Sequence, residues 1–297
     1  MNIIDSSFLA KTPPPERIAA LRTMARAKDI GNIAADSVPA DQRDCGEYFT
    51  LGAAIFDRAM AGGAGYAGLP LAALHEIYSA EAEDMGAASA FTLLCAERAS
   101  AALQAKGSKR QNAPDRPILW ARESRHARQN GYLYPPGLTE LGIDPARILY
   151  VDAPDSIALL CAAADALRSH VPCAVIAELS GARPKGLDLT ATRRLSLSAQ
   201  KSGIPVFCLR IDAAPMASAA FSRWRIASAP AQPLEANAPG YPVFDVDLLR
   251  HRGGLEGLSA RLEWHSEQKS FRDAPDIGAV PAVSGNGTHI ENIRKRA

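Results

Sequence analysis

The 297-residue sequence has no excess of either charge sign, because 33 basic and 32 acidic residues leave a net charge of +1. A balanced chain has no global attraction to nucleic acid or to a membrane surface, so such a contact would need a local patch. Aromatic residues are also scarce, at 6%, whereas hydrophobic residues make up 47%. These proportions predict a globular protein whose core consists of small and branched aliphatic side chains.

Long hydrophobic runs are missing as well. No N-terminal apolar stretch has the form of a signal peptide, and no run approaches the roughly 20 residues that a membrane-spanning helix needs. We therefore expect a cytoplasmic protein without a membrane contact.

Cysteine pairs and metal-ligand spacings are absent. The five cysteines are scattered without a C-x-x-C pair, and the six histidines show no metal-ligand spacing. A reduced cysteine within an apolar run behaves as a small core residue, so we expect structural thiols and no metal site. The cysteines within such runs are Cys95, Cys161, Cys173 and Cys208.

What the sequence does have, from residue 47 onward, is an alternation of short apolar runs and helical patterns. Near-continuous apolar strands separated by helices indicate a parallel sheet that is covered on both faces, and hence the α/β class. The runs predicted to be strands are 73–78, 117–121, 147–151, 174–177 and 205–209, and the predicted helices are 88–104, 156–169 and 188–202. We expect Asp188 to cap the last of these helices and Gly203 to close it in a left-handed conformation.

Beyond residue 221 the helical patterns stop. Three strand-like segments follow, SRWRIAS, VFDVDLLRHR and SARLEW, and they should pair antiparallel and extend the sheet. The sequence thus predicts an N-terminal helix and linker at 1–46, a core domain at 47–265 and a flexible tail at 266–297. The N-terminal helix reads equally well as a packed helix and as an arm for partner binding or self-association.

The segment between the first predicted strand and its helix has the layout of a phosphate-binding loop without the lysine. Such a loop needs glycines that aim backbone N–H groups at phosphates, followed by Lys and Ser/Thr. Here Ser79 replaces the first glycine, Gly86 matches the second, and Ala87-Ala88 occupies the Lys-Thr position. Glu81, Glu83 and Asp84 add three negative charges, each of which repels a phosphate by about 1 kcal/mol even at water's dielectric. We therefore expect no ATP binding and no cofactor.

Around this loop, the sequence resembles the RecA-type ATPase core. GYAGLPLAALHEIY resembles the beginning of that core, and YPPGLTELGIDPARILYVDAPDSIALLCAAADALRSHVPCAVIAELSG follows its pattern almost element by element. The resemblance implies a RecA-like, mostly parallel sheet flanked by helices, with antiparallel strands added at the C-terminal end.

A RecA-like core with a degraded phosphate loop resembles, more narrowly, the ImuA family of inducible-mutagenesis cassettes. LDLTATRRLSLSAQKSGIPVFCLR, SRWRIASAPA and LLRHRGG…LEW are also similar to that family, and the resemblance covers residues 50–265. It implies a non-enzymatic accessory protein of SOS-induced, error-prone translesion DNA synthesis. The implied partners are an inactive Y-family polymerase homologue and an error-prone replicative-type polymerase, with RecA, DNA and self-association as further candidates.

Two acidic residues stand where a RecA ATPase would use them. Glu178 ends an apolar strand, in the place of the magnesium-associated carboxylate, and Glu123 is near the place of the water-activating glutamate. Without a lysine to position a γ-phosphate, neither could support efficient phosphoryl transfer. We interpret them as a solvated acid at a strand end and an acid at the start of a helix.

Seven residues are candidates for contacts with DNA or a partner. Arginines can contact phosphates and a tryptophan can stack on a base, but the same residue types anchor protein interfaces or simply lie on the surface. The candidates are Arg193, Arg194, Arg223, Trp224, Arg225, Arg250 and Arg252. Two other functions stay open beside the accessory role: a RecA-type ATPase that binds single-stranded DNA, and a damage-induced regulator of cell division.

Overall fold

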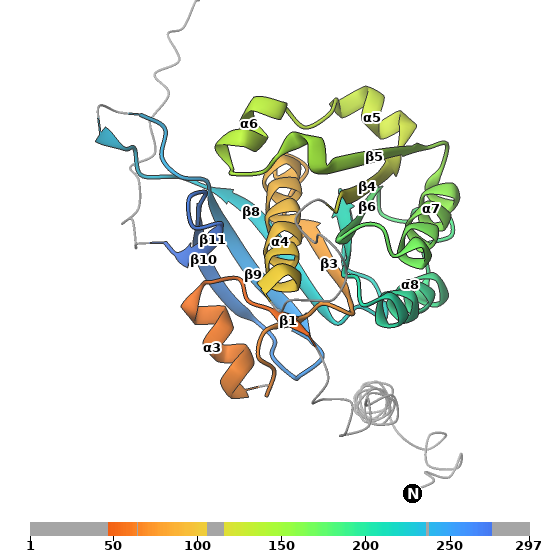
Figure 1. Cartoon of the computed structure of the whole chain (residues 1–297), viewed down its shortest axis with the longest axis horizontal. Helices are drawn as coiled ribbons and strands as arrows, with labels where there is room; N and C mark the ends of the chain where they lie inside the picture. Colours follow the sequence, from red (N-terminus) through yellow and green to blue (C-terminus); the bar gives the residue numbers. More distant parts are fainter. Residues whose placement is uncertain (1–46, 64, 106–115, 236–237, 275–297) are drawn as a thin grey trace, which may run out of the picture. The chain divides into compact units, whose positions relative to one another are not determined.

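The computed structural model describes residues 47–63, 65–105, 116–235 and 238–274. The helix and linker expected at 1–46, Cys45 among them, lie outside these residues and remain predictions. Within the described residues the chain forms an α/β structure in which helices flank one large sheet (Figure 1).

The large sheet has nine strands in the order β11-β10-β9-β8-β3-β7-β6-β4-β5. From β5 to β8 every neighbouring pair is parallel, and from β8 to β11 every pair is antiparallel. The strands are β3 (Leu74–Ser79), β4 (Ile118–Glu123), β5 (Ile148–Ala153), β6 (Ala174–Ser180), β7 (Val206–Ile211), β8 (Ser222–Ala229), β9 (Val243–His251), β10 (Leu258–His265) and β11 (Ser270–Asp273). Two short strands, β1 (Tyr48–Phe49) and β2 (Leu69–Pro70), form a separate antiparallel pair.

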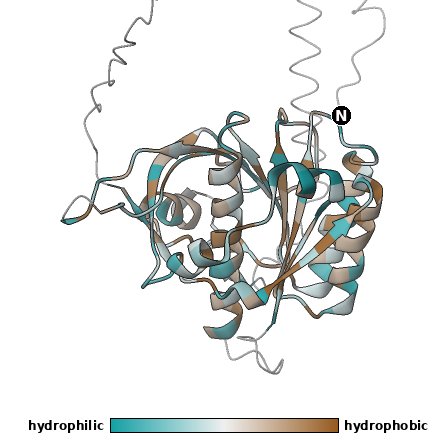
Figure 2. Ribbon diagram, turned by 90° about the horizontal axis from the view of Figure 1, so that it is seen from above, coloured by the Kyte–Doolittle hydropathy of each residue, from teal (hydrophilic) through white to brown (hydrophobic). Residues whose placement is uncertain are grey.

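The predicted strands 73–78 and 174–177 are both interior strands, β3 and β6, as expected from their apolar continuity. All six residues of β3 and the first six of β6 are buried. In the view coloured by hydropathy, brown segments run along strands in the middle of the fold (Figure 2). The α/β class with a mostly parallel sheet and added antiparallel strands is therefore confirmed.

Helices cover the sheet on two faces, each with its own apolar core. On one face, α3 (Ala54–Gly63) and α4 (Met85–Ala105) pack through Phe56 and Phe91 against strand residues such as Trp224. On the other, α7 (Ser156–Ser169) and α8 (Leu189–Ser202) contribute Leu167 and Leu195. Three short helices connect β4 to β5: α5 (Ser124–Asn130), α6 (Pro135–Glu140) and η3 (Pro145–Arg147).

The capping residues predicted for α8 are confirmed. The side chain of Asp188 accepts a hydrogen bond of 2.7 Å from the Ala191 N–H, and Gly203 closes the helix with a left-handed φ of 69°. Helix α4 begins at Met85, three residues before the predicted start, because the Asp84 carbonyl already accepts the Ala88 N–H. The acidic end of the loop therefore belongs to the start of the helix.

Two details at the C-terminal end differ from the expectation. The strand SRWRIAS, now β8, pairs antiparallel with β9 but parallel with β3, so it also joins the parallel part of the sheet. The expectation that a tail begins at residue 266 is wrong for residues 266–274, because β11 forms a hairpin with β10 in which Phe271 packs on Trp264. The remainder of the expected tail, 275–297, lies outside the described residues.

Candidate functional site

The loop that resembles a phosphate site lies at the carboxyl end of β3. It comprises residues 80–84, between the last residue of β3, Ser79, and the first of α4, Met85. Open α/β sheets bind their ligands at the carboxyl ends of the strands, so the position is that of a binding site. Whether it can hold a phosphate depends on where its N–H groups point.

The N–H groups of this loop are largely consumed by the chain itself. Ala80 donates to the Ile226 carbonyl of β8 at 2.8 Å, and Glu81 donates to the carboxylate of Asp84 at 3.3 Å. Asp84 and Met85 donate to the carbonyls of Glu81 and Ala82 at 3.2 and 3.3 Å, which closes two turns within the loop. A phosphate cradle needs such donors to converge on the ligand. Here they stabilise the loop instead.

Asp84 holds the loop against β8. Its Oδ1 accepts from both the N–H and the Oγ of Ser228 at 2.8 Å. Partial burial raises the pKa of Asp84, but these hydrogen bonds, together with the one from Glu81, outweigh it and leave the pKa below its usual value. The carboxylate is therefore ionised at neutral pH, at the helix N-terminus where an anionic ligand would need a positive field.

The positions of the missing loop residues show no phosphate cradle either. Ala88 is buried, and Ala87 is partly buried against the core. A Cβ added at Gly86 would meet nothing within 4 Å, so this glycine is not required by close packing. Ser79 is buried, and its Oγ has no hydrogen-bond partner among the described residues. These residues do not fit a nucleoside triphosphate.

Glu178 is a buried structural acid and not the solvated residue that we expected. Its Oε2 accepts from the indole N–H of Trp120 at 2.6 Å, and its Oε1 lies 2.8 Å from Nε2 of His126. Both oxygens are thus engaged between β4, β6 and α5. Glu123 is partly buried and precedes α5 as its N-cap residue, without a capping hydrogen bond from its side chain. This position agrees with our interpretation of an acid at the start of a helix.

Two of the seven contact candidates lie inside the structure. Trp224 is 2% exposed and donates to Ser222 Oγ at 2.8 Å, so the prediction that it can stack on a base is wrong. Its side chain points to the face of β8 that α4 covers, where Phe56 and Phe91 pack against it. Arg223 is on the opposite face and forms a 2.9 Å ion pair with Glu76, which is completely buried.

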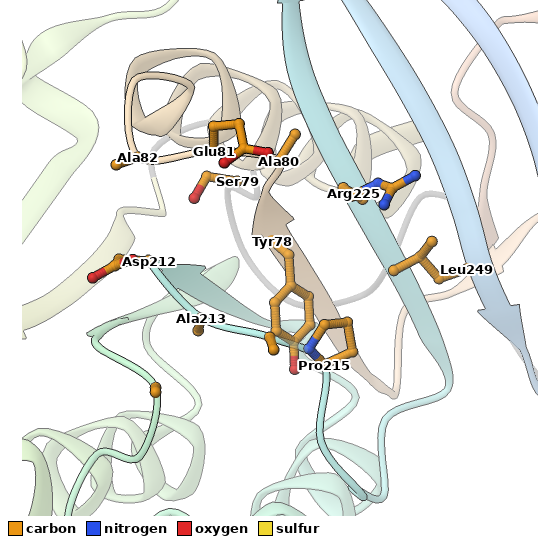
Figure 3. Close-up of a pocket in the computed structure, with 12 residues that line it drawn as sticks. Tyr78, Ser79, Ala80, Glu81, Ala82, Asp212, Ala213, Pro215, Arg225 and Leu249 are labelled. Carbon is orange, nitrogen blue, oxygen red and sulfur yellow. The ribbon is translucent and has the colours of Figure 1, made fainter.

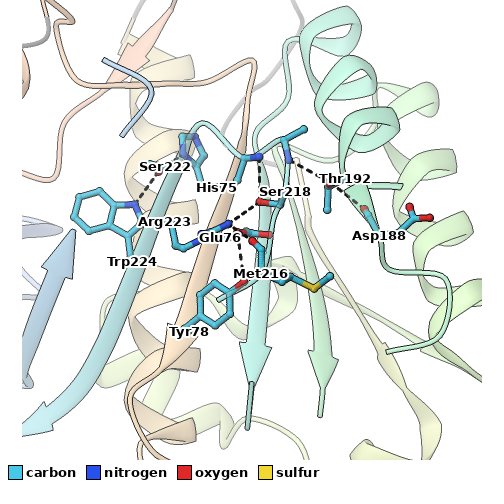
Figure 4. A network of polar contacts seen from close by, with 12 residues as sticks. His75, Glu76, Tyr78, Asp188, Thr192, Met216, Ser218, Ser222, Arg223 and Trp224 are labelled. Atoms are coloured by element: carbon cyan, nitrogen blue, oxygen red, sulfur yellow. Dashed lines mark hydrogen bonds and ion pairs between the residues drawn. The ribbon is translucent and has the colours of Figure 1, made fainter. Parts of the chain in front are cut away.

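Arg223 also fastens the connection between β7 and β8, residues 212–221. It donates to the Met216 carbonyl and, at 3.0 Å, to Ser218 Oγ, as Figure 4 shows. The next residue of this connection, Ala219, donates to Thr192 Oγ1 on α8 at 3.2 Å. Arg223 is therefore a structural link between β3 and this connection.

The other candidates are more accessible but do not form one patch. Arg225 is exposed and bonded to Asp247 at 2.7 Å, while Arg250 is opposite Arg223 in the β8–β9 register. Arg252 is partly buried and donates to the Ala219 carbonyl. Arg193 and Arg194 are both exposed on α8. The structure thus brings the β8 and β9 arginines together and leaves the α8 pair on a separate element.

Sequence reasoning missed the charged residues inside the central strands. Glu76 and Arg210 are both 0% exposed, and the guanidinium groups of Arg210 and Arg223 lie 5.5 and 5.9 Å from the ring centre of Tyr78. Burial, and secondarily the Glu76 charge, raises the pKa of Tyr78 to about 12. The sequence did contain a signal for these buried charges, because LHEIYS and VFCLRI each have one charged residue within an otherwise mostly apolar strand.

Next to the loop lies a pocket of about 450 Å³, shown in Figure 3. It is formed by the end of β3 and the loop after it (Tyr78, Ser79, Ala80, Glu81 and Ala82), by the residues after β7 (Asp212, Ala213, Ala214 and Pro215), and by Ala182, Arg225 and Leu249. The pocket is on the side of the loop that faces the β7–β8 connection. Ser79, Ala80, Glu81 and Ala82 line it, so the pocket adjoins the predicted site directly.

Other predicted features of the chain can be placed as well. Three of the described cysteines are buried, but Cys161 is exposed on α7, so its assignment to the core is wrong. Among the described residues no group of three or more His, Cys, Asp or Glu side chains could hold a metal ion. No described helix is long and apolar enough to cross a membrane.

Comparison with known proteins gives one set of relatives. No family model matches the chain. The chain is 34% identical, over 204 residues, to "Protein ImuA" of Caulobacter vibrioides strain NA1000 / CB15N, and equally to that of strain ATCC 19089 / CIP 103742 / CB 15. The match covers 64% of this chain and 74% of each relative.

Proposed function

This chain belongs to the ImuA family, and on that basis we propose that it is an accessory protein of damage-induced mutagenesis that acts through protein contacts. Its role would be to help assemble the polymerases that copy past lesions, without nucleotide chemistry of its own. The proposed partners are the inactive Y-family polymerase homologue of the same cassette and an error-prone replicative-type polymerase. RecA, DNA and a second copy of the chain are further candidates.

The observation that carries the non-enzymatic part of this proposal is the self-satisfied loop at residues 80–84. Phosphoryl transfer depends on donors and a cation held around the γ-phosphate. In this chain the N–H groups of Ala80, Glu81 and Asp84 are bound to the loop itself and to β8, and Ala87 replaces the lysine. Glu178 is at the place of a magnesium-associated acid, but its carboxylate is bonded to Trp120 and His126. The loop, Ala87 and Glu178 all argue against ATP hydrolysis.

Affinity purification of the tagged full chain from DNA-damaged cells, with mass spectrometry of the bound proteins, tests the accessory role. We expect polymerases to be enriched relative to undamaged cells and to cells carrying the tag alone. Recovery of cell-division proteins in place of polymerases would contradict the proposal and support the division-regulator alternative.

A further inference from the structure

The pocket beside the loop has a charged end and an apolar end. Glu81, from the loop after β3, and Asp212, from the connection after β7, lie at one end in Figure 3, near Ser79. The Tyr78 ring and Pro215 lie at the other end. Both carboxylates are exposed, and neither has a hydrogen-bond or ion-pair partner among the described residues. Two unpaired carboxylates beside an apolar wall favour a ligand with a cationic head and an apolar stem.

Ser79 gives an independent sign of a ligand. It lines the pocket and is 5% exposed, yet its Oγ has no hydrogen-bond partner among the described residues. A buried hydroxyl without a partner is unfavourable, and it can accept a hydrogen bond from an ammonium or guanidinium group. Ser79 is where a phosphate loop would have its first glycine.

The backbone at Asp212 also marks this pocket. Asp212 has a φ of 49°, a left-handed conformation that is uncommon for residues other than glycine, asparagine and aspartate. Such conformations concentrate at binding sites, where the surrounding structure maintains them. The left-handed turn directs the chain from the end of β7 into the wall formed by Ala213, Ala214 and Pro215.

Basic residues near the pocket have partners other than the two carboxylates. Of the two arginines beside the Tyr78 ring, Arg223 is bonded to Glu76, and Arg210 donates to the carbonyls of Gly181 and Ala182. Arg225 lines the pocket, but its guanidinium is bonded to Asp247 at 2.7 and 2.9 Å. Arg183 and Lys185 follow β6 and are exposed, and neither lines the pocket. The acids at the mouth are therefore open to an incoming cation.

We propose that this pocket receives a lysine or arginine side chain that a protein partner presents. The methylene stem would lie along Tyr78 and Pro215, and the cationic head would contact Ser79, Glu81 and Asp212. The inference rests on the proposed function, because it gives the protein-contact role a place on the molecule. Glu81, one of the acids that oppose a phosphate in the loop, then becomes one of the two carboxylates that recognise a basic side chain.

A randomised peptide library displayed on phage, selected against the immobilised full chain, tests the pocket without any assumption about the natural partner. We expect the enriched peptides to share a Lys or Arg, and replacement of that residue by Gln to weaken binding about tenfold. Binding should also weaken as salt is raised, since part of it is electrostatic. Enrichment of acidic or purely apolar peptides would overturn the proposal.

The double variant Glu81→Gln, Asp212→Asn removes both charges, and asparagine tolerates the left-handed backbone at position 212. The enriched peptides should bind it about tenfold more weakly. The matched control is Glu140→Gln, Glu267→Gln, which makes the same charge change at two exposed sites that do not line this pocket. Equal binding to wild type and to the pocket variant, or equal loss in both variants, would contradict a specific site.

The two proposals can fail separately. If peptides with a Lys or Arg are enriched and bind at the pocket, but purification from damaged cells yields no polymerases, the pocket proposal is supported and the accessory role is contradicted. If polymerases are recovered equally well with wild type and with Glu81→Gln, Asp212→Asn, and no basic peptides are selected, the role stands and the pocket proposal fails.

Discussion

At the scale of single residues, neighbouring positions on β8 have different roles. Trp224 points to the α4 core, and Arg223 and Arg225 lie on the opposite face, as the period of two along a strand requires. The two arginines differ because of their partners: Arg223 pairs with the fully buried Glu76 of β3, and Arg225 pairs with the partly exposed Asp247 of β9.

Replacing Arg223 by alanine should destabilise the protein by about 3–5 kcal/mol, because it leaves the Glu76 carboxylate buried without its ion-pair partner. Arg225→Ala is the matched control on the same strand, and should cost no more than about 1 kcal/mol, because its ion pair with Asp247 is solvent-screened. Urea denaturation of both variants measures the difference. Similar losses in the two variants would show that the Glu76–Arg223 pair is not a buried structural link.

The variant Ala87→Lys, Ala88→Thr tests whether the loop lacks only its side chains. We expect no measurable ATP affinity in calorimetry with magnesium, for the wild type or for this variant. The acids Glu81, Glu83 and Asp84 remain in this variant. The N–H groups of Ala80, Glu81 and Asp84 also stay bonded within the loop and to β8. Micromolar binding by the unmodified protein would contradict the degenerate-loop interpretation and support the ATPase alternative.

At the scale of elements, local sequence signals placed α7 and α8 well, whereas the helical patterns did not include α3 or α5. Asp155 and Asp188 cap α7 and α8 by accepting N–H groups three residues later, at 2.8 and 2.7 Å. Both aspartates satisfy a donor that the first helical turn would otherwise leave free. These contacts join residues close in sequence, which is why the pattern alone could predict the helix boundary at Asp188.

Asp188→Ala should lower the free energy of unfolding by about 1 kcal/mol through loss of the cap. Asp188→Asn is the conservative control, since asparagine is an equally good N-cap, and it should restore most of that stability. Thermal unfolding of the three proteins measures the effect. A loss of equal size in Asp188→Asn would attribute it to the charge at the helix N-terminus rather than to the capping hydrogen bond.

At the scale of the whole molecule, two buried histidines make stability depend on pH. His75 is 1% exposed between the Pro70 carbonyl and Ser222 Oγ, which also accepts the Trp224 N–H. The Pro70 carbonyl can only accept, so Nε2 of His75 carries a proton, and in the neutral ring Nδ1 accepts from the Ser222 hydroxyl. Burial lowers the pKa of His75 to about 4, and burial likewise lowers that of His251 to about 4.

Stability should therefore fall as the pH is lowered from about 6.5 toward 4. In this range the unfolded histidines bind protons near pH 6.5, whereas the folded ones do so only near pH 4. Each histidine then contributes a slope of about 1.4 kcal/mol per pH unit, with stability higher at the higher pH. Denaturant unfolding at several pH values measures it.

His170→Asn is a suitable control for that measurement, because His170 is exposed and has a left-handed φ of 56° that asparagine tolerates. Its pH profile should match that of the wild type. A flat profile of the wild type between pH 4 and 6.5 would contradict neutral burial of His75 and His251.

The sequence by itself determined the α/β class, the interior strands β3 and β6, the caps of α8 and the loss of the phosphate-loop lysine. Each of these depends on residues adjacent in the chain or at a fixed helical or strand period, so it is visible without the tertiary structure. The ImuA resemblance followed from the order of such elements, and comparison with relatives confirmed it.

The tertiary structure decided how distant residues meet. The parallel pairing of β8 with β3 brings Arg223 to Glu76, 147 positions apart, and the β3–β7 pairing brings Asp212 to the loop after β3. The hairpin that adds β11 depends on the packing of Phe271 against Trp264 and Phe91. Burial of a charged or aromatic side chain depends on what packs against it, and long-range sheet pairing fixes that packing in ways local periodicity does not encode.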